Sequence, residues 1–307
     1  MLDRRSFVGL AAGAGASMAL PRRSRSAPAA HKHGAKDGAA MLTRPMPRTG
    51  EALPVIGLGT YGTFDASAGQ RGPLVEVMRR FLDLGGRVID SSPMYGQSEA
   101  AVGEVLGALG KPKVFLATKV WTTGKSEGDA QMADSARLLG APVDLMQIHN
   151  LVDWKTHMAT LRAMKTAGQI RYIGVTHYAT SAFGEIEEIM KSGAVDAIQI
   201  PYSIAAREAE KRILPAAADH KVAVLVMRPF ERAALFDKVK GKPLPPWAAE
   251  LGCASFAQIF LKFILGHPAV TVPIPATASV KHLEDNMAAG RGPLPTEAQR
   301  KQMLALI

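Results

Sequence analysis

The sequence predicts a (β/α)8 barrel of the TIM type for the body of the chain, and two observations support this fold class. From about residue 50 onward, short β-branched runs alternate with longer segments in which apolar residues recur at helical spacing. Eight such pairs fit into roughly 260 residues, the usual size of a barrel of eight strands and eight helices. An open doubly wound sheet, which binds a dinucleotide at a glycine-rich first turn, is the alternative.

Eight short apolar runs are predicted to be the barrel strands. They cover residues 55–59, 87–90, 114–119, 143–149, 171–175, 197–200, 222–227 and 270–274. The segments between them read as helices, because apolar residues such as Leu74, Val77 and Met78 recur at the spacing of one helix face. Residues 45–53 are expected to form a ribbon across the bottom of the barrel. Residues 231–252, rich in proline and without clear periodicity, are expected to form a loop over the top.

Composition and charge exclude several classes of protein. The chain has 307 residues, of which 47% are hydrophobic and 21% charged, and this composition is typical of a globular protein with a large core. No apolar run is long enough to span a membrane, so we expect no stable span in the mature protein. The single cysteine, Cys253, excludes an internal disulfide framework and a cysteine zinc cluster, and we expect no metal site.

The first forty residues differ from the rest and predict export. Arg4 and Arg5 precede a mild apolar run at 9–20, which is the pattern of a twin-arginine signal, and small residues at 27–30 offer a cleavage site that the sequence does not define. We therefore divide the chain into a signal at 1–30, a linker or extension at 31–48 and the barrel at 49–307. The expected partner is the twin-arginine (Tat) export machinery, and the expected location is the periplasm or another exported compartment. A disordered basic tail with a chance arginine pair is the alternative.

The net charge of +10 gives no support for nucleic-acid binding. Residues 1–40 hold seven Lys or Arg and two Asp, hence +5, and the remaining 30 basic and 25 acidic residues give the other +5. Half of the excess therefore belongs to the tail, and the body has no basic cluster interleaved with aromatic residues. A small molecule, rather than nucleic acid, is the expected ligand.

Three predicted strands end on ionisable residues, and these residues are the candidate catalytic groups. Asp90, Lys119 and His149 end the second, third and fourth strands, and Tyr95 follows Asp90 by five positions. Each has an ordinary structural explanation when taken alone, as a helix cap, a snorkelling cation, a core histidine or a packed loop residue. Together they are hard to explain by packing, because charge at a buried strand end is costly unless it is paired. In a barrel of this kind, the carboxyl ends of the strands are where the chemistry occurs.

At these positions the chain resembles the aldo-keto reductases, over about residues 50–290. The matching stretches are 53–60, 90–99, 118–119, 144–149, 173–175, Gln199, 273–275 and 283–286. In that family an Asp, Tyr, Lys and His tetrad reduces carbonyls with a nicotinamide cofactor. The resemblance thus implies an NAD(P)-dependent oxidoreductase that reduces aldehydes and ketones or oxidises the corresponding alcohols, with Asp90, Tyr95, Lys119 and His149 as the tetrad.

The chemistry of the four residues suits this reaction on physical grounds as well. Hydride addition to a carbonyl builds negative charge on oxygen, which needs a proton donor and a polar wall. The ordinary pKa of tyrosine, about 10, is high for that task, and a nearby Lys119 ammonium is expected to make Tyr95 a stronger acid. Asp90 would keep Lys119 charged and in place. His149 would donate a hydrogen bond to the substrate oxygen.

The resemblance also implies where a cofactor binds, and here the chain departs from the family pattern. The implied cofactor contacts are Gly59, Thr60, Tyr61, Thr176, His177, Gln199, Met227, Arg228, Pro229, Thr277, Lys281, His282, Asp285 and Asn286. Thr176 and His177 stand where the family has Ser and Asn, and Met227 stands where an aromatic ring often stacks on the nicotinamide. NADP(H) is the expected cofactor. NAD(H) is the alternative, because the forked arginine contact to a 2′-phosphate is missing after the last strand.

The expected substrate is a small carbonyl compound in an apolar pocket. Aromatic residues that follow the strands are the candidate pocket walls: Tyr61, Trp121, Trp154 and Phe230. Two other functions remain open at this point. One is a reductase-like sensor or partner protein that binds nicotinamide with little turnover, and the other is a non-redox barrel hydrolase or isomerase that uses Asp90 and His149 as acid and base.

Overall fold

Eight parallel strands form the centre of the structure, a computed structural model that describes residues 39–307. Each strand pairs with the next along the chain. The strands are β3 (Leu58–Gly59), β4 (Val88–Asp90), β5 (Phe115–Val120), β6 (Leu145–His149), β7 (Tyr172–Thr176), β8 (Ala197–Pro201), β9 (Ala223–Met227) and β10 (Val272–Pro273). All eight predicted strands are present. The proposed export signal and residues 31–38 lie outside the described residues.

The first and last strands meet, and their contact closes the sheet into the predicted barrel. Gly59 pairs with Ala276 in a parallel bridge, and the N–H of Gly59 donates to the Pro275 carbonyl at 3.2 Å. The N–H of Gly57 donates to the Pro273 carbonyl at 3.0 Å. A Cβ atom at Gly59 would lie 2.6 Å from the Ile274 carbonyl oxygen, so only glycine permits this approach.

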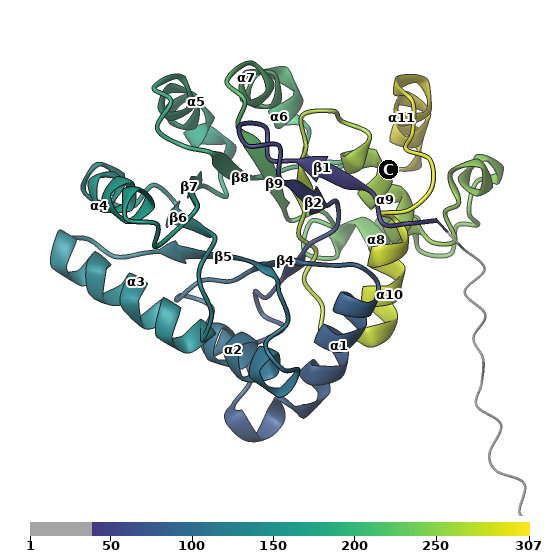
Figure 1. The fold of residues 1–307 in the computed structure, drawn as a ribbon. Helices are drawn as coiled ribbons and strands as arrows, with labels where there is room; N and C mark the ends of the chain where they lie inside the picture. The colour runs from purple at the N-terminus through teal and green to yellow at the C-terminus, as the bar shows by residue number, and fades with distance from the viewer. Residues whose placement is uncertain (1–38) are drawn as a thin grey trace, which may run out of the picture. The chain divides into compact units, whose positions relative to one another are not determined.

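Helices surround the strands on the outside of the barrel (Figure 1). They are α1 (Gly72–Asp83), α2 (Ser98–Ala108), α3 (Lys125–Leu139), α4 (Trp154–Thr166), α5 (Phe183–Lys191), α6 (Glu208–Lys211), α7 (Ile213–Asp219), α8 (Ala234–Val239), α9 (Phe256–Leu265), α10 (Val280–Ala288) and α11 (Glu297–Met303). Short 3-10 turns occur at Ala68–Gln70, Thr180–Ala182, Pro246–Leu251 and Leu304–Leu306. The predicted spacing of apolar residues in α1 corresponds to its buried face, which includes Leu74, Val77 and Met78.

The buried side chains form two separate cores because successive residues of a strand point to opposite faces. Residues such as Ile89, Met146 and Ile198 point outward into the layer between strands and helices. Residues of the other parity fill the barrel interior with a smaller cluster: Met46, Leu53, Val88, Phe115, Ala117, Leu145, Tyr172, Ala197, Ala223, Leu225, Val272 and Ile274. The interior is therefore a packed core at its lower end.

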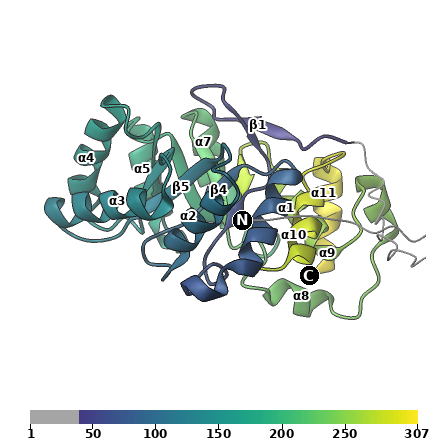
Figure 2. The ribbon, with the colours of Figure 1, turned by 60° about the horizontal axis from the view of Figure 1, so that its bottom comes forward.

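A ribbon of β1 (Thr43–Pro45) and β2 (Ala52–Pro54) closes the amino-terminal end of the barrel, as predicted. Met46 and Leu53 enter the interior cluster from it. The Arg44 guanidinium donates to the carbonyl oxygens of Leu265, His267 and Val270, which precede β10. The ribbon begins at Thr43, inside the range 31–48 assigned to the linker, because residues 43–45 pair with 52–54. Figure 2 shows β1 and α8 on opposite sides of the structure.

The segment at 231–252 is not the structureless loop that the sequence suggested. It contains α8 and the 3-10 helix Pro246–Leu251, joined by an irregular stretch. Leu235 and Val239 are buried four residues apart on α8, and Ala248 and Leu251 three residues apart on the 3-10 helix. The prolines between them obscured two short helical repeats that pack on the rest of the barrel.

Two structural features are absent from residues 39–307. Residues 39–307 include no helix long and apolar enough to cross a membrane. The same residues include no cluster of three or more His, Cys, Asp or Glu side chains arranged to hold a metal ion.

Candidate active site

The alternation of side chains along the strands brings the predicted groups together at the carboxyl end of the barrel. Asp90 lies two positions beyond Val88, and Lys119 two positions beyond Ala117, so both share the parity of the interior cluster. His149 follows Leu145 by four positions and points the same way. Three strands thus deliver three ionisable groups to one side of the barrel interior.

Asp90 and Lys119 form a buried ion pair. The Lys119 Nζ donates to Asp90 Oδ2 at 2.7 Å and to the Ser91 carbonyl at 2.6 Å, and the two residues are 0% and 2% exposed respectively. The other oxygen of Asp90 accepts from Gln147 Nε2 at 3.1 Å and from Gln199 Nε2 at 2.8 Å. Burial alone would lower the pKa of Lys119, but the negative charge of Asp90 and the Tyr95 hydroxyl raise it overall. Lys119 therefore stays charged, as predicted.

Tyr95 reaches the pair from the turn after β4. The N–H of Tyr95 donates to the Ser92 carbonyl at 3.0 Å, and the N–H of Gln97 donates to Asp65 Oδ1 at 2.8 Å, which fixes the turn. Gly96 adopts a φ of 60°, and a Cβ there would collide with the Asp65 carboxylate. The Lys119 Nζ lies 4.8 Å from the centroid of the Tyr95 ring. Phenol, ammonium and carboxylate are therefore adjacent.

The acidity of Tyr95 differs from the sequence expectation. Burial raises the pKa of Tyr95, the Lys119 charge lowers it, and the Asp90 charge raises it again. The net pKa lies above 10 because burial and Asp90 outweigh the ammonium. Tyr95 thus holds its proton in this site, and Lys119 limits the rise rather than reversing it.

His149 is a neutral imidazole. Its Nδ1 lies 3.1 Å from the Ser92 Oγ, so Nε2 is the ring nitrogen left for the cavity. Burial, followed by the charges of Lys119 and His177, lowers the pKa of His149 from 6.5 to about 3. A neutral ring whose Nδ1 accepts from Ser92 carries its hydrogen on Nε2 and can donate it to a ligand oxygen.

The low pKa of His149 predicts a pH-dependent loss of stability. Between pH 6.5 and about 3 the unfolded chain binds a proton at this histidine and the folded chain does not. The contribution of His149 to the free energy of unfolding therefore falls by about 1.4 kcal/mol for each unit of acidification in this window. Urea denaturation of wild type and His149→Gln at pH 6.5, 5.5 and 4.5 measures the free energy of unfolding of each. The value for wild type minus the value for the variant should decrease at each step of acidification. A constant difference across the three pH values would mean that the folded histidine is protonated.

A cavity of about 1030 Å³ opens above these groups at the carboxyl end of the barrel. Asp90, Tyr95 and His149 line it. Most of the positions implied for cofactor and substrate also line it: Gly59, Thr60, Tyr61, Gln199, Met227, Arg228, Pro229, Phe230, Thr277, Lys281, His282, Asp285 and Asn286. One continuous space therefore joins the catalytic groups to the start of α10.

Four of the positions predicted for cofactor and substrate do not line this cavity. Thr176 is fully buried beneath it, with an Oγ1 that has no hydrogen-bond partner among the described residues. His177 stacks on Tyr178 with ring centroids 5.2 Å apart. Trp121 is 42% exposed beside His149, with ring centroids 6.4 Å apart. Trp154 points away toward α5, because its Nε1 donates to Glu185 at 2.7 Å.

The structure adds residues that sequence reasoning missed. Gln147 donates a hydrogen bond to Asp90. It lies two residues before His149 on the same strand, so the alternation of side chains could have predicted that it faces the interior. Asn150 and Arg232 line the cavity from the loops after β6 and β9. Their sequence neighbourhoods carry no periodic signal, since a loop residue is placed by backbone turns that the pattern does not define.

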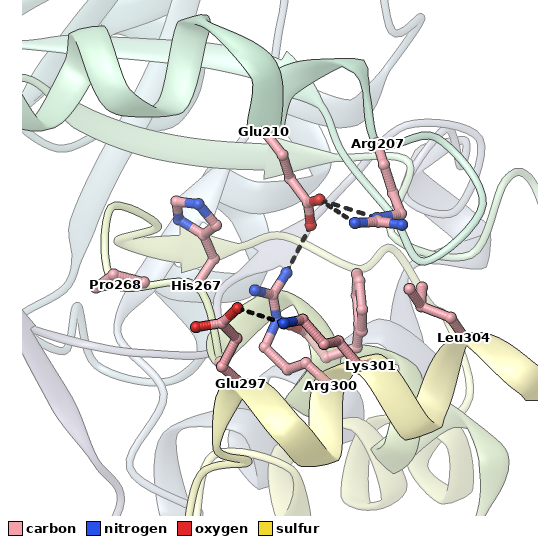
Figure 3. A pocket seen from close by; sticks show the side chains of 10 residues that line it. Arg207, Glu210, His267, Pro268, Glu297, Arg300, Lys301 and Leu304 are labelled. Atoms are coloured by element: carbon pink, nitrogen blue, oxygen red, sulfur yellow. Dashed lines mark hydrogen bonds and ion pairs between the residues drawn. The ribbon is translucent and has the colours of Figure 1, made fainter.

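A smaller hollow of about 340 Å³ lies outside the barrel between α6, the end of α9 and α11 (Figure 3). Its charged groups pair with one another. Glu210 binds Arg207 at 2.5 Å and Arg300 at 2.6 Å, and Glu297 binds Lys301 at 2.9 Å. This network links helices and leaves the larger cavity as the candidate site.

Comparison with known proteins agrees with the geometry. The Aldo/keto reductase family model matches residues 55–301. Methylglyoxal reductase YeaE of Escherichia coli (strain K12) is 28% identical over 246 residues, which cover 77% of this chain and 85% of that protein. The NADH-specific methylglyoxal reductase of the same organism is 28% identical over 227 residues, covering 62% of this chain and 68% of that protein.

A solved structure supports the same relationship. The aldo/keto reductase from Klebsiella pneumoniae, in complex with NADP and acetate, superimposes with a TM-score of 0.72 and 27% identity. The match covers 84% of this chain and 92% of that protein.

Proposed function

The chain belongs to the aldo/keto reductase family and is an NAD(P)-dependent oxidoreductase of carbonyl groups, and from this premise we propose that it reduces small aldehydes and ketones with Tyr95 as the proton donor. The observation that carries this proposal is the buried Asp90 and Lys119 pair beneath the Tyr95 ring, at the floor of the large cavity. Such a pair is costly to bury, and its position under a phenol gives it a chemical use.

Each of the chain's own residues has a distinct task in this proposal. Tyr95 holds its proton until negative charge develops on the substrate oxygen, and the nearby Lys119 ammonium then stabilises the phenolate. Asp90 keeps Lys119 charged, while His149 donates from Nε2 to the same oxygen. When bound, a reduced nicotinamide cofactor supplies the hydride to the carbonyl carbon.

The hydrolase or isomerase alternative is not favoured by this geometry. Asp90 already accepts hydrogen bonds from Lys119, Gln147 and Gln199, so it is not free to act as a base toward a ligand. His149 has a pKa of about 3 and is a weak base at neutral pH.

The residues at the inner end of the cavity fit a nicotinamide. Gln199 lines this end of the cavity with a primary amide, and a carboxamide, which has one acceptor and two donors, can pair with it. The sulfur of Met227, which lines the same space, is suited to contact a flat ring.

The other end of the cavity fits phosphate groups. Lys281 and His282 lie in the first turn of α10, where backbone N–H groups lack helical partners and attract anions. Arg228 and Arg232 line the cavity from the loop after β9, and the Arg228 guanidinium lies 5.1 Å from the centroid of the Tyr178 ring. The positive charge of this lining favours NADP(H), which carries one phosphate more than NAD(H).

Two measurements on the purified protein test the function. Fluorescence titration should give a lower Kd for NADPH than for NADH, and absorbance at the nicotinamide band should show oxidation of NADPH when propanal is added. Equal affinities would contradict the phosphate site. Binding without turnover would instead indicate a sensor, and failure to bind either nucleotide would indicate a non-redox enzyme.

Export by the twin-arginine pathway is a further part of the proposal. It is supported by Arg4 and Arg5 ahead of the apolar run at 9–20, and this pathway carries folded proteins that can retain a bound cofactor. Replacing both arginines with lysine should shift the protein from the periplasmic to the cytoplasmic fraction. An unchanged distribution would contradict this route.

A further inference from the structure

Ser92 lies between Asp90 and Tyr95 in the turn after β4, and it has no access to solvent. Its Oγ lies 3.1 Å from His149 Nδ1 and accepts from the Met94 N–H at 3.4 Å. A hydroxyl has a single hydrogen to donate. Among residues 39–307, Nδ1 is the one acceptor that this hydrogen reaches, so the serine donates to the histidine.

The opposite arrangement of hydrogens would leave a buried donor without a partner. If Nδ1 carried the ring hydrogen and donated to Oγ, the hydroxyl hydrogen of Ser92 would have no acceptor at a position that is 0% exposed. An unpartnered buried donor costs roughly 1–3 kcal/mol. Ser92 therefore holds the hydrogen of the neutral His149 ring on Nε2.

Tyr95 and His149 then present the same kind of group to a ligand oxygen. Both residues line the cavity, and their rings meet edge to face with centroids 5.9 Å apart. Tyr95 holds its proton and donates from its hydroxyl, while His149 donates from Nε2. A carbonyl oxygen has two lone pairs and no hydrogen, so it can accept from both groups. An alcohol carries a hydrogen of its own, which is left without an acceptor beside two donors.

We propose that Ser92 is a positioning residue that makes the site bind carbonyl compounds in preference to alcohols, by fixing the hydrogen of His149 on Nε2. This inference rests on the proposed function and concerns its direction. The preference favours capture of the carbonyl substrate, and it favours release of the alcohol product once Tyr95 has regained its proton. The equilibrium constant of the reaction is unchanged, so the effect belongs to binding constants.

Two unreactive ligands of the complex with NADP+ measure this preference. Acetone cannot be reduced by the oxidised cofactor, and 2-methyl-2-propanol cannot be oxidised because its carbinol carbon has no hydrogen. Their inhibition constants against 1-propanol oxidation give the ratio of carbonyl to alcohol affinity. Ser92→Ala removes the donor to Nδ1 and should lower the preference for acetone about fivefold, the effect of one hydrogen bond of about 1 kcal/mol.

Two further variants separate this role from a general loss of packing. Ser92→Thr keeps the hydroxyl and should retain most of the wild-type preference. Ser135→Ala removes another hydroxyl that is 0% exposed, but this one donates to Glu99 at 3.1 Å between α2 and α3 and does not line the cavity. It should leave the preference at the wild-type value.

The tautomer of His149 is a second readout, which a merely structural role of Ser92 would not move. Long-range 1H–15N spectra of protein labelled at histidine distinguish a ring nitrogen that carries a hydrogen from one that does not, and His149→Gln assigns the signals. Wild type and Ser92→Thr should carry the hydrogen on Nε2. Ser92→Ala should give signals averaged between the two tautomers.

The outcomes that overturn the inference are distinct from failure of the function itself. A ring hydrogen on Nδ1 in wild type, an unchanged preference for acetone in Ser92→Ala, or an equal loss of preference in Ser135→Ala would each refute the role of Ser92. If wild type neither reduces propanal with NADPH nor oxidises 1-propanol with NADP+, the proposed function is refuted. The spectra would then still test whether Ser92 sets the tautomer of His149.

Discussion

Tyr95→Phe is expected to lower kcat for propanal reduction by roughly 10² to 10⁴-fold, the usual effect of removing a general acid. The substitution deletes only the hydroxyl. The ring should keep its edge contacts with Tyr61 and His149, whose ring centroids lie 5.1 Å and 5.9 Å away. Steady-state kinetics with saturating NADPH measures this loss.

A matched substitution at the other end of the barrel provides the control. Tyr172 is buried in the interior cluster, and its hydroxyl donates to Glu51 at 2.6 Å near the closing ribbon. Tyr172→Phe removes the same atom far from the cavity, so it should lower stability slightly and leave kcat unchanged. The Kd for NADPH should be close to wild type in both variants. Unchanged turnover in Tyr95→Phe would show that another group donates the proton.

Lys119→Met is expected to lower the free energy of unfolding by about 3–5 kcal/mol, the cost of leaving a buried charge without its partner. Methionine has a similar length and fills the space, so the loss comes from the charge. The Asp90 carboxylate would keep only its contacts to Gln147 and Gln199 in a site that is 2% exposed. Urea denaturation at pH 7 measures the loss, and carbonyl reduction should fall as well because the Tyr95 phenolate is no longer stabilised.

The double variant Asp90→Asn with Lys119→Met separates the effect of charge from the effect of packing. Removing both charges should restore most of the stability lost in Lys119→Met, since a neutral amide can still bond to the two glutamines. Activity should stay low in the double variant. If Lys119→Met is as stable as wild type, or if the second substitution brings no recovery, the pair is not the buried charge pair that the geometry indicates.

Much of the barrel and of the candidate site could be predicted from the sequence, because both follow from the alternation of side chains along the strands. A strand in a barrel places every second residue inside, so a polar residue with the parity of the interior apolar residues must face the interior. Asp90, Lys119 and Gln199 satisfy this condition, and the alternation that marks the strands also marks these groups. Tyr95 was accessible through its short distance from Asp90 in a turn that a proline and a glycine delimit.

The wrong predictions concern features that no periodic pattern of side chains indicates. Trp154 looked like a pocket wall because it follows a strand, but the turn after His149 directs it toward Glu185 on α5. The segment at 231–252 looked structureless because its helical repeats are only one or two turns long. The pKa of Tyr95 depends on a balance between burial and the charges of Lys119 and Asp90. The sequence does not show how deeply a side chain is buried.

The sequence alone therefore determined the barrel, the order of its strands and the positions of Asp90, Lys119 and His149 at neighbouring strand ends, because local periodicity and strand ends can be read along the chain. Only the tertiary structure decided which loops reach the cavity. It places Arg228, Arg232 and Asn150 on the wall and turns Trp154 away, since long-range packing and left-handed backbone turns set the direction of loop side chains. It also decided the protonation of the site, where burial outweighs the charges that the sequence had already placed side by side.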